Sequence, residues 1–176
     1  MIHKKIKRKH KIGLFIFAVI VVGLLLPQKF SMPVEGATTS SYNNETFWYY
    51  PWGKSVTHKG VDIFAKKGTP IHSSTVGIVL LASKFGSGNS VLILGPKWRL
   101  HYYTHLNEVK IKSFRPVGHN TLIGTVGNTG NAINTPPHLH YSIGTLVPYV
   151  WRIDKDRQGW KKAFYLNPIN YLETTK

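Results

Sequence analysis

The sequence contains no cysteine, and only seven of its 176 residues are acidic. The lack of cysteine excludes a disulfide framework, a thiolate nucleophile and thiolate metal ligands. A metal site in this chain would therefore have to be built from histidine and carboxylate side chains. The nine histidines are numerous enough for that purpose.

The shortage of acid leaves a formal net charge of +16, from 23 lysines and arginines. Six of these cations fall within the first eleven residues, so 17 cations against seven acids belong to the rest of the chain. A domain this basic is expected to contact a polyanion, such as nucleic acid, anionic lipid or an acidic wall polymer. The charge alone does not choose among them.

The N-terminal end has the pattern of an export signal. Its basic start is followed by an uncharged apolar run over 12–26, which is somewhat short for a membrane span. We therefore predict that the domain is preceded by an N-terminal apolar helix, a signal peptide or a signal anchor over 1–30, which places the following domain outside the cytoplasm. An uncleaved segment would make the inner membrane a partner, and export argues against nucleic acid. The polar segment 31–46 is predicted to be a linker, and 47–176 the folded domain.

Composition predicts a mainly β fold in a small single domain. Aromatic residues make up 12% of the chain, and 16 glycines and 10 prolines provide frequent turns. The segments 76–82 and 90–94 read as a hairpin, 99–106 as another strand and 166–172 as a short closing helix. The aromatic cluster 47–52 is interpreted as a strand that covers the core, with a substrate groove as the alternative.

Two pairs of residues indicate a metal site. His138 and His140 would project from one face of a strand, because residues two apart share a face. His58 and Asp62 stand four apart around Gly60, so a turn entering a strand can bring both onto one centre. The alternatives are surface histidines that form ordinary hydrogen bonds, and an aspartate paired with a nearby lysine, Lys59 or Lys66.

His105 lies at the end of the strand 99–106 and is the more plausible functional histidine there. His101 and His105 have the spacing of a helical zinc pair, but the glutamate of that motif is absent and the composition is that of a strand. The glycines at 124, 127 and 130 lack the ending of a phosphate-binding loop. They are interpreted as a tight turn beside the site.

Taken in order, these motifs are His58-Lys-Gly-Val-Asp62, Tyr103-Thr-His105-Leu106, the three glycines and Pro137-His138-Leu-His140. In this order they resemble metallopeptidase family 23, the lysostaphin-like or LytM-type zinc endopeptidases, over about 56–144. The resemblance implies one Zn²⁺ bound by His58, Asp62 and His140, with His105 and His138 as the catalytic pair. It also implies antiparallel sheets of the duplicated-hybrid-motif type with a narrow active-site groove.

These observations predict an exported zinc endopeptidase of the bacterial cell envelope that cleaves peptidoglycan stem peptides or crossbridges. Its other partners would be the inner membrane, through an uncleaved N-terminal segment, and anionic wall polymers, but not nucleic acid. The alternative is a non-catalytic scaffold of the same family that binds and activates a cell-wall amidase. The sequence leaves open which of His105 and His138 acts as the base and which stabilises the oxyanion.

Overall fold

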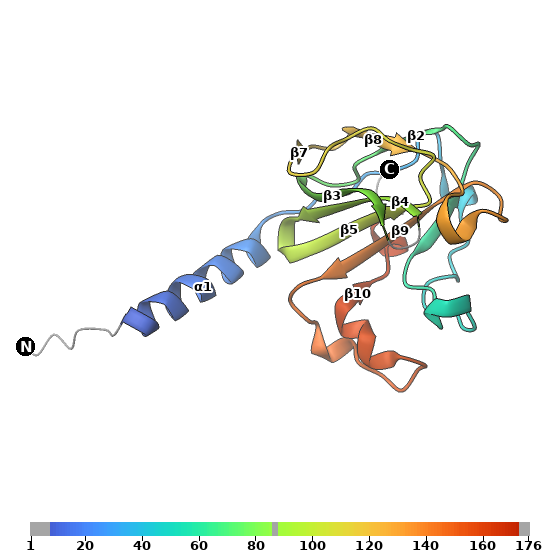
Figure 1. The fold of residues 1–176 in the computed structure, drawn as a ribbon. Coiled ribbons are helices and arrows are strands. Elements are labelled where there is room, and N and C mark those ends of the chain that lie inside the picture. Colours follow the sequence, from blue (N-terminus) through green and yellow to red (C-terminus); the bar gives the residue numbers. More distant parts are fainter. Residues whose placement is uncertain (1–7, 86–87, 173–176) are drawn as a thin grey trace, which may run out of the picture.

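The computed structural model describes residues 8–85 and 88–172. Its main element is a seven-stranded antiparallel sheet in the order β1-β9-β5-β4-β3-β7, with β10 paired to the far end of β9 (Figure 1). The strands are β1 (Val61–Phe64), β3 (Gly77–Phe85), β4 (Gly88–Gly95), β5 (Arg99–Thr104), β7 (Pro116–Val117), β9 (His138–Thr145) and β10 (Tyr165–Leu166). The predicted mainly β, antiparallel architecture is confirmed.

A smaller sheet of three strands lies over the larger one. It has the order β2-β8-β6 and consists of β2 (Pro70–His72), β8 (Leu122–Thr125) and β6 (Glu108–Val109). Ile71 and Ile123 of this sheet belong to the same buried cluster as Val79, Val91 and Ile93 of the large sheet. Burial of apolar side chains between the two sheets is therefore the main stabilising contribution.

Short-range patterns account for the strands that carry the site. Val61 and Ile63 of β1 are fully buried while the residues between and after them are not, which is the alternation expected of a strand with one face on the core. β3 and β4 form the predicted hairpin. β9 lies between β1 and β5, so that it is paired on both sides.

The helix α1 (Arg8–Leu25) projects away from the sheets, as Figure 1 shows. It touches the domain near its C-terminal end, where the Trp98 indole donates a hydrogen bond of 3.0 Å to the Ile20 carbonyl. Within residues 8–85 and 88–172, no helix combines the length and the hydropathy required to span a membrane. The signal peptide or signal anchor over 1–30 stays a prediction.

The segment predicted as a linker packs in part against the domain. Val34 is 1% exposed and forms a β-bridge with Ile71, and Tyr42 is also buried. Just before this segment, Gln28 forms a hydrogen bond with His101 and Phe30 stacks on a tyrosine ring. These contacts were not visible in the sequence, because single apolar residues in a polar segment give no periodic pattern. The start of the domain at 47 stays a prediction.

The aromatic cluster 47–52 does not form the strand that we predicted. It consists of turns that lead into the 3₁₀ helix η2 (Gly53–Ser55). Trp48 packs against the core, whereas Tyr49 and Tyr50 are about half exposed. The short closing helix is confirmed as α2 (Ile169–Leu172), with the Asn167 side chain accepting a hydrogen bond from the first helical amide.

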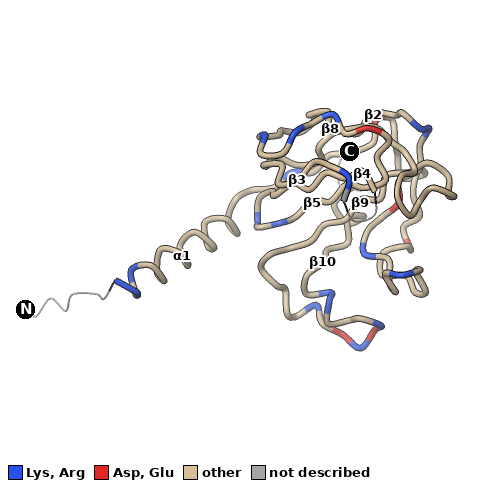
Figure 2. The backbone as a smooth tube through the Cα atoms, in the orientation of Figure 1, with Lys and Arg blue, Asp and Glu red and all other residues tan. Residues whose placement is uncertain are grey.

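The remaining 3₁₀ helices are η1 (Thr39–Ser41), η3 (Pro96–Trp98), η4 (Gly130–Ala132), η5 (Val150–Arg152) and η6 (Gly159–Phe164). Figure 2 shows that lysines and arginines occupy loops on several sides of the domain and that acidic residues are few. The predicted tight turn after β8 is present as η4, and it lies beside the pocket described next.

Candidate metal centre and active-site pocket

Antiparallel pairing of β1 with β9 places an aspartate beside a histidine. Asp62 lies directly opposite His140 in the register, and side chains in such positions project from the same face. His58 precedes β1, where its amide donates to the Tyr49 carbonyl (3.0 Å) and its carbonyl accepts from the Trp48 amide (2.6 Å). These hydrogen bonds hold the His58 imidazole against the two strands.

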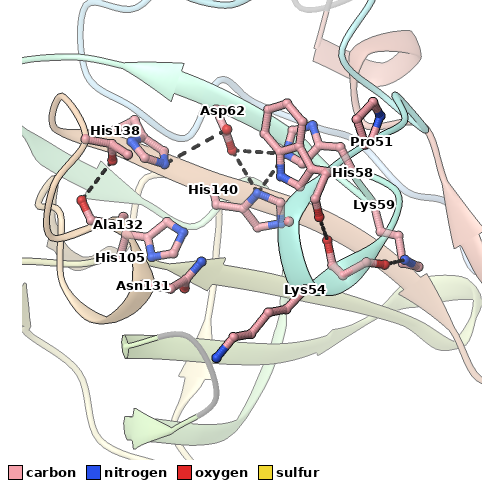
Figure 3. Close-up of a pocket in the computed structure, with 14 residues that line it drawn as sticks. Pro51, Lys54, His58, Lys59, Asp62, His105, Asn131, Ala132, His138 and His140 are labelled. Carbon is pink, nitrogen blue, oxygen red and sulfur yellow. Dashed lines mark hydrogen bonds and ion pairs between the residues drawn. The ribbon is translucent and has the colours of Figure 1, made fainter.

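Three side chains converge on one point, as Figure 3 shows. The Asp62 Oδ1 atom lies 3.1 Å from His58 Nε2 and 2.8 Å from His140 Nδ1, and these two nitrogens are 3.0 Å apart. All three potential ligand atoms lie within 4.8 Å of one another. Two imidazoles and one carboxylate are a ligand set suited to Zn²⁺, with a coordination position left for water or substrate.

The hydrogen bonds around His58 show that this arrangement fits a cation. The Nδ1 atom of His58 donates to the Thr46 carbonyl at 3.0 Å, which leaves a lone pair on Nε2. That lone pair faces the Asp62 carboxylate and His140 Nδ1, and a single proton on His140 cannot satisfy all three atoms. A metal ion at the centre of these three atoms would satisfy all of them. The backbone carbonyl of Thr46 thereby fixes the tautomer of His58, as outer-shell groups commonly do in metal sites.

Charge in the cluster favours binding of a cation. Burial alone would raise the pKa of the Asp62 carboxyl, but the imidazoles of His140 and His58 outweigh it and hold that pKa far below its ordinary value. Burial lowers the pKa of His140, although Asp62 opposes this. At neutral pH Asp62 is therefore an ionised carboxylate and His140 a neutral imidazole, which are the protonation states that metal binding requires of these two groups.

Gly60 leaves room for the His140 ring. A Cβ atom at this position would lie 2.6 Å from the Tyr141 carbonyl oxygen and 2.8 Å from Cε1 of His140. This carbonyl belongs to the backbone of β9, which is paired with β1, so moving it would disrupt the pairing of the two strands. The glycine between His58 and Asp62 is therefore required by close approach to β9.

We expect Gly60→Ala to weaken metal binding by about 10- to 100-fold, because the new methyl group displaces His140 from the cluster. The affinity can be measured by competition with a chromogenic chelator. Gly118→Ala is the matched control, because a Cβ atom there has no neighbour within 4 Å. Equal metal affinity in the two variants would show that the close approach at Gly60 is not important for the site.

His105 and His138 lie on the other side of His140 from His58 (Figure 3). His105 Nδ1 donates to the Thr129 carbonyl at 3.0 Å, and His138 Nδ1 donates to the Pro136 carbonyl at 2.8 Å. Each histidine therefore keeps a lone pair on Nε2. The two rings meet edge to face with centroids 5.0 Å apart, and His138 Nε2 is 4.0 Å from the Asp62 carboxylate. Two basic nitrogens thus lie beside the candidate metal cluster.

His105 occupies an unusual backbone conformation. It follows β5 with φ of 67°, a left-handed value that non-glycine residues seldom adopt. The turn lifts the ring out of the sheet and into the pocket, where Thr129 holds it. Burial, reinforced by the neighbouring imidazoles of His140 and His138, lowers the pKa of His105 to about 4. His105 is therefore neutral at pH 7 and able to accept a proton.

The cluster forms the floor of a pocket of about 940 Å³. Its walls include Trp52, Lys54, Asn131 and Thr135. The Trp52 ring stacks on His58 with centroids 4.1 Å apart and an interplanar angle of 26°. Part of the aromatic cluster at 47–52 thus lines the pocket, as the groove alternative required, while Trp48 packs inside.

His101, the other histidine of β5, is not part of the pocket. It is fully buried, and because Gln28 Nε2 donates to its Nε2 atom, its Nδ1 atom donates to the Tyr141 hydroxyl at 2.7 Å. The structure brings together all five histidine and aspartate positions expected from the sequence: His58, Asp62, His105, His138 and His140. Sequence reasoning missed the stacked ring of Trp52 and the carbonyl groups of Thr46 and Thr129. Of these features, only the Trp52 ring had a signal in the sequence, namely the aromatic cluster 47–52.

The comparisons with known proteins agree with this geometry. The model of peptidase family M23 matches residues 56–150. The peptidoglycan DD-endopeptidase ShyA of Vibrio cholerae is 33% identical over 113 residues, which are 63% of this chain and 26% of ShyA. The chain therefore spans about a quarter of that relative.

Solved structures show the same fold. The catalytic domain of lysostaphin from Staphylococcus simulans aligns with a TM-score of 0.58 and 25% identity, over 77% of this chain and 95% of that domain. A zinc-containing peptidase from Vibrio cholerae aligns with a TM-score of 0.54 and 28% identity, over 65% of this chain and 36% of the other. With a family match over more than half of its length and this fold around the histidine cluster, the chain belongs to peptidase family M23.

Proposed function

We propose that this chain is a zinc-dependent endopeptidase that hydrolyses peptide bonds in the stem peptides or crossbridges of bacterial peptidoglycan. The observation that carries the proposal is the convergence of His58, Asp62 and His140 on one point, with two further imidazole nitrogens beside it. A structural zinc site would be closed by four protein ligands, whereas this cluster has three and opens into a pocket.

In this proposal, His58 Nε2, a carboxylate oxygen of Asp62 and His140 Nδ1 would hold the metal. When bound, Zn²⁺ supplies Lewis acidity, which polarises a carbonyl group and lowers the pKa of water to about 7. The single negative charge of Asp62 leaves a net positive charge in the pocket. That charge favours the negative charge that develops on the carbonyl oxygen during attack.

The proton is moved by His105 and His138. Their Nε2 atoms carry lone pairs, because both Nδ1 atoms donate to backbone carbonyls. One of them accepts a proton as water adds its oxygen to the carbonyl carbon. The resulting imidazolium can stabilise the oxyanion by a hydrogen bond and then give its proton to the amine nitrogen as the carbon–nitrogen bond breaks, so that the peptide bond and water give a carboxylic acid and an amine. The backbone hydrogen bonds keep the rings of His105 and His138 in place before substrate arrives, and stacking on Trp52 does the same for His58.

The proposed substrate and location come from the relatives and from the sequence. ShyA is named a peptidoglycan DD-endopeptidase, and the family match covers the whole histidine cluster. The basic composition and the apolar run over 12–26 support an exported protein of the bacterial cell envelope. We place the catalytic domain at 47–176 and keep 28–46 with it in experiments, since Val34 lies in its core.

The purified full-length chain loaded with zinc should release soluble peptide-containing fragments from isolated sacculi. Removal of the metal by a chelator should abolish the release, and added zinc should restore it. The reason is that no other described group in the pocket can polarise the scissile carbonyl as strongly. Absorbance of the sacculus suspension, followed over time, measures the result. Continued digestion by His140→Ala would contradict the metal assignment.

A further inference from the structure

The segment between β9 and β10 presents an exposed apolar surface away from the pocket. We call residues 146–164 the aromatic loop. It contains η5 and η6, and in Figure 1 it projects below the large sheet. Six of its apolar side chains are exposed: Leu146 (55%), Val150 (61%), Trp151 (77%), Ile153 (51%), Trp160 (59%) and Phe164 (38%). A concentration of this kind on an ordered surface marks an interaction site.

The aromatic loop is anchored to the rest of the domain at its start and again near Gln158. Beside α1, the Leu146 amide donates to the Trp98 carbonyl at 2.9 Å. Beside the pocket, Thr57 donates to the Gln158 side chain at 3.1 Å, and the Trp48 indole donates to a loop carbonyl at 3.1 Å. The exposed rings are therefore held in place by the fold.

The aromatic loop is also cationic. It carries five basic residues, Arg152, Lys155, Arg157, Lys161 and Lys162, against two acids, Asp154 and Asp156. Lys162 is hydrogen-bonded to both acids and offsets one of their two negative charges, so the loop as a whole keeps a net charge of 5 − 2 = +3. Figure 2 shows these cations on the projecting loop. Such a surface is complementary to an anionic one.

The aliphatic members of this surface favour lipid as the partner. A soluble anionic polymer would pair with the cations but leave Val150 and Ile153 in water. Tryptophan beside lysine and arginine is typical of the membrane–water interface, where rings enter the headgroup region and cations meet anionic lipid. The loop is also continuous with α1 through Trp98, and α1 exposes Phe15 (70%) and Leu25 (76%).

We propose that the aromatic loop binds an anionic lipid surface, with Trp151 and Trp160 entering the headgroup region and the flanking cations contacting lipid phosphates. This contact would be additional to any made by the N-terminal segment. It does not depend on the proposed peptidase activity, because none of the participating residues lines the pocket.

The test uses the full-length chain and vesicles of phosphatidylcholine, alone or mixed with phosphatidylglycerol. Wild type should sediment preferentially with the anionic vesicles. When the same vesicles are made from lipids with brominated acyl chains, the bromine atoms should quench part of the protein's indole fluorescence. The double variant Trp151→Ser, Trp160→Ser should lose about tenfold in affinity for anionic vesicles and most of the quenching. Wild type and the double variant both retain α1. A difference in quenching between them therefore reports lipid contact by Trp151 and Trp160, and not binding through α1.

Two further variants make the test specific. Phe114→Ser removes an aromatic ring that is 80% exposed outside the aromatic loop, and it should bind as wild type. Lys155→Gln should lose about fivefold for anionic vesicles only. The proposal fails if the double tryptophan variant, with unchanged thermal unfolding, binds and is quenched as wild type. It also fails if soluble polyphosphate binds the loop while the vesicles leave its indoles unquenched.

Discussion

Replacing Asp62 with alanine should abolish stoichiometric zinc binding and lower peptidoglycan hydrolysis by at least about 10³-fold. The carboxylate is the single anionic group in the cluster, and it contacts both His58 and His140. Its loss leaves two neutral nitrogens, too few ligands for tight binding. A 10³-fold loss corresponds to about 4 kcal/mol of transition-state stabilisation, a magnitude that Lewis acid catalysis supplies. Metal content by elemental analysis and the rate of sacculus digestion provide the two measurements.

The companion variant Asp62→Asn keeps the shape of the side chain and removes its charge. It should also lose most of its zinc. That result would show that Asp62→Ala loses zinc because the negative charge is missing, and not because the shorter side chain leaves a cavity. Glu45→Gln applies the same chemical change to an exposed acid and should change neither measurement. An Asp62→Ala protein that retains one zinc and wild-type activity would remove Asp62 from the ligand set.

Replacing His105 or His138 with alanine should leave one zinc per chain and lower hydrolysis by about 10²- to 10⁴-fold. Neither ring belongs to the cluster of three ligand atoms, yet both present Nε2 beside it. Loss of a positioned acid or base has effects of this size. The combination of retained metal and lost activity distinguishes these two histidines from His58 and His140.

The matched control for both variants is His119→Ala, which removes an imidazole in the turn before β8, outside the pocket. It should digest sacculi at the wild-type rate. If His105→Ala and His138→Ala both lose zinc instead of activity alone, the division between ligands and catalytic residues is wrong. If either variant retains full activity with full zinc, that histidine does not transfer the proton.

Much of the site could be predicted from the sequence, because side chains in a strand alternate between its two faces with a period of two residues. The placement of His138 and His140 on one face of β9 follows from their spacing of two residues. Burial of Val61 and Ile63 follows from alternation in β1 and fixes the direction of Asp62. The order of the motifs supplied the remaining assignment, since spacing alone does not show which histidines meet across the fold.

Other features depend on tertiary contacts that no local pattern records. Every residue has a carbonyl group, so the sequence could not indicate that Thr46 and Thr129 would orient His58 and His105. The aromatic cluster at 47–52 reads as a strand by composition, but there Trp52 N donates to the Val56 carbonyl in a turn that stacks its ring on His58. Tertiary packing thus overrode strand propensity at this place.

The central claim is that this chain itself hydrolyses a peptide bond within peptidoglycan. The most direct measurement is mass spectrometry of the fragments that the zinc-loaded full-length chain releases from purified peptidoglycan, with no other enzyme present. The account predicts fragments with a new amine and a new carboxylate between two amino acids of a stem or crossbridge, and none from His138→Ala. Release that occurs only after a separate amidase is added, with cleavage at the bond between sugar and peptide, would contradict it and favour the scaffold alternative.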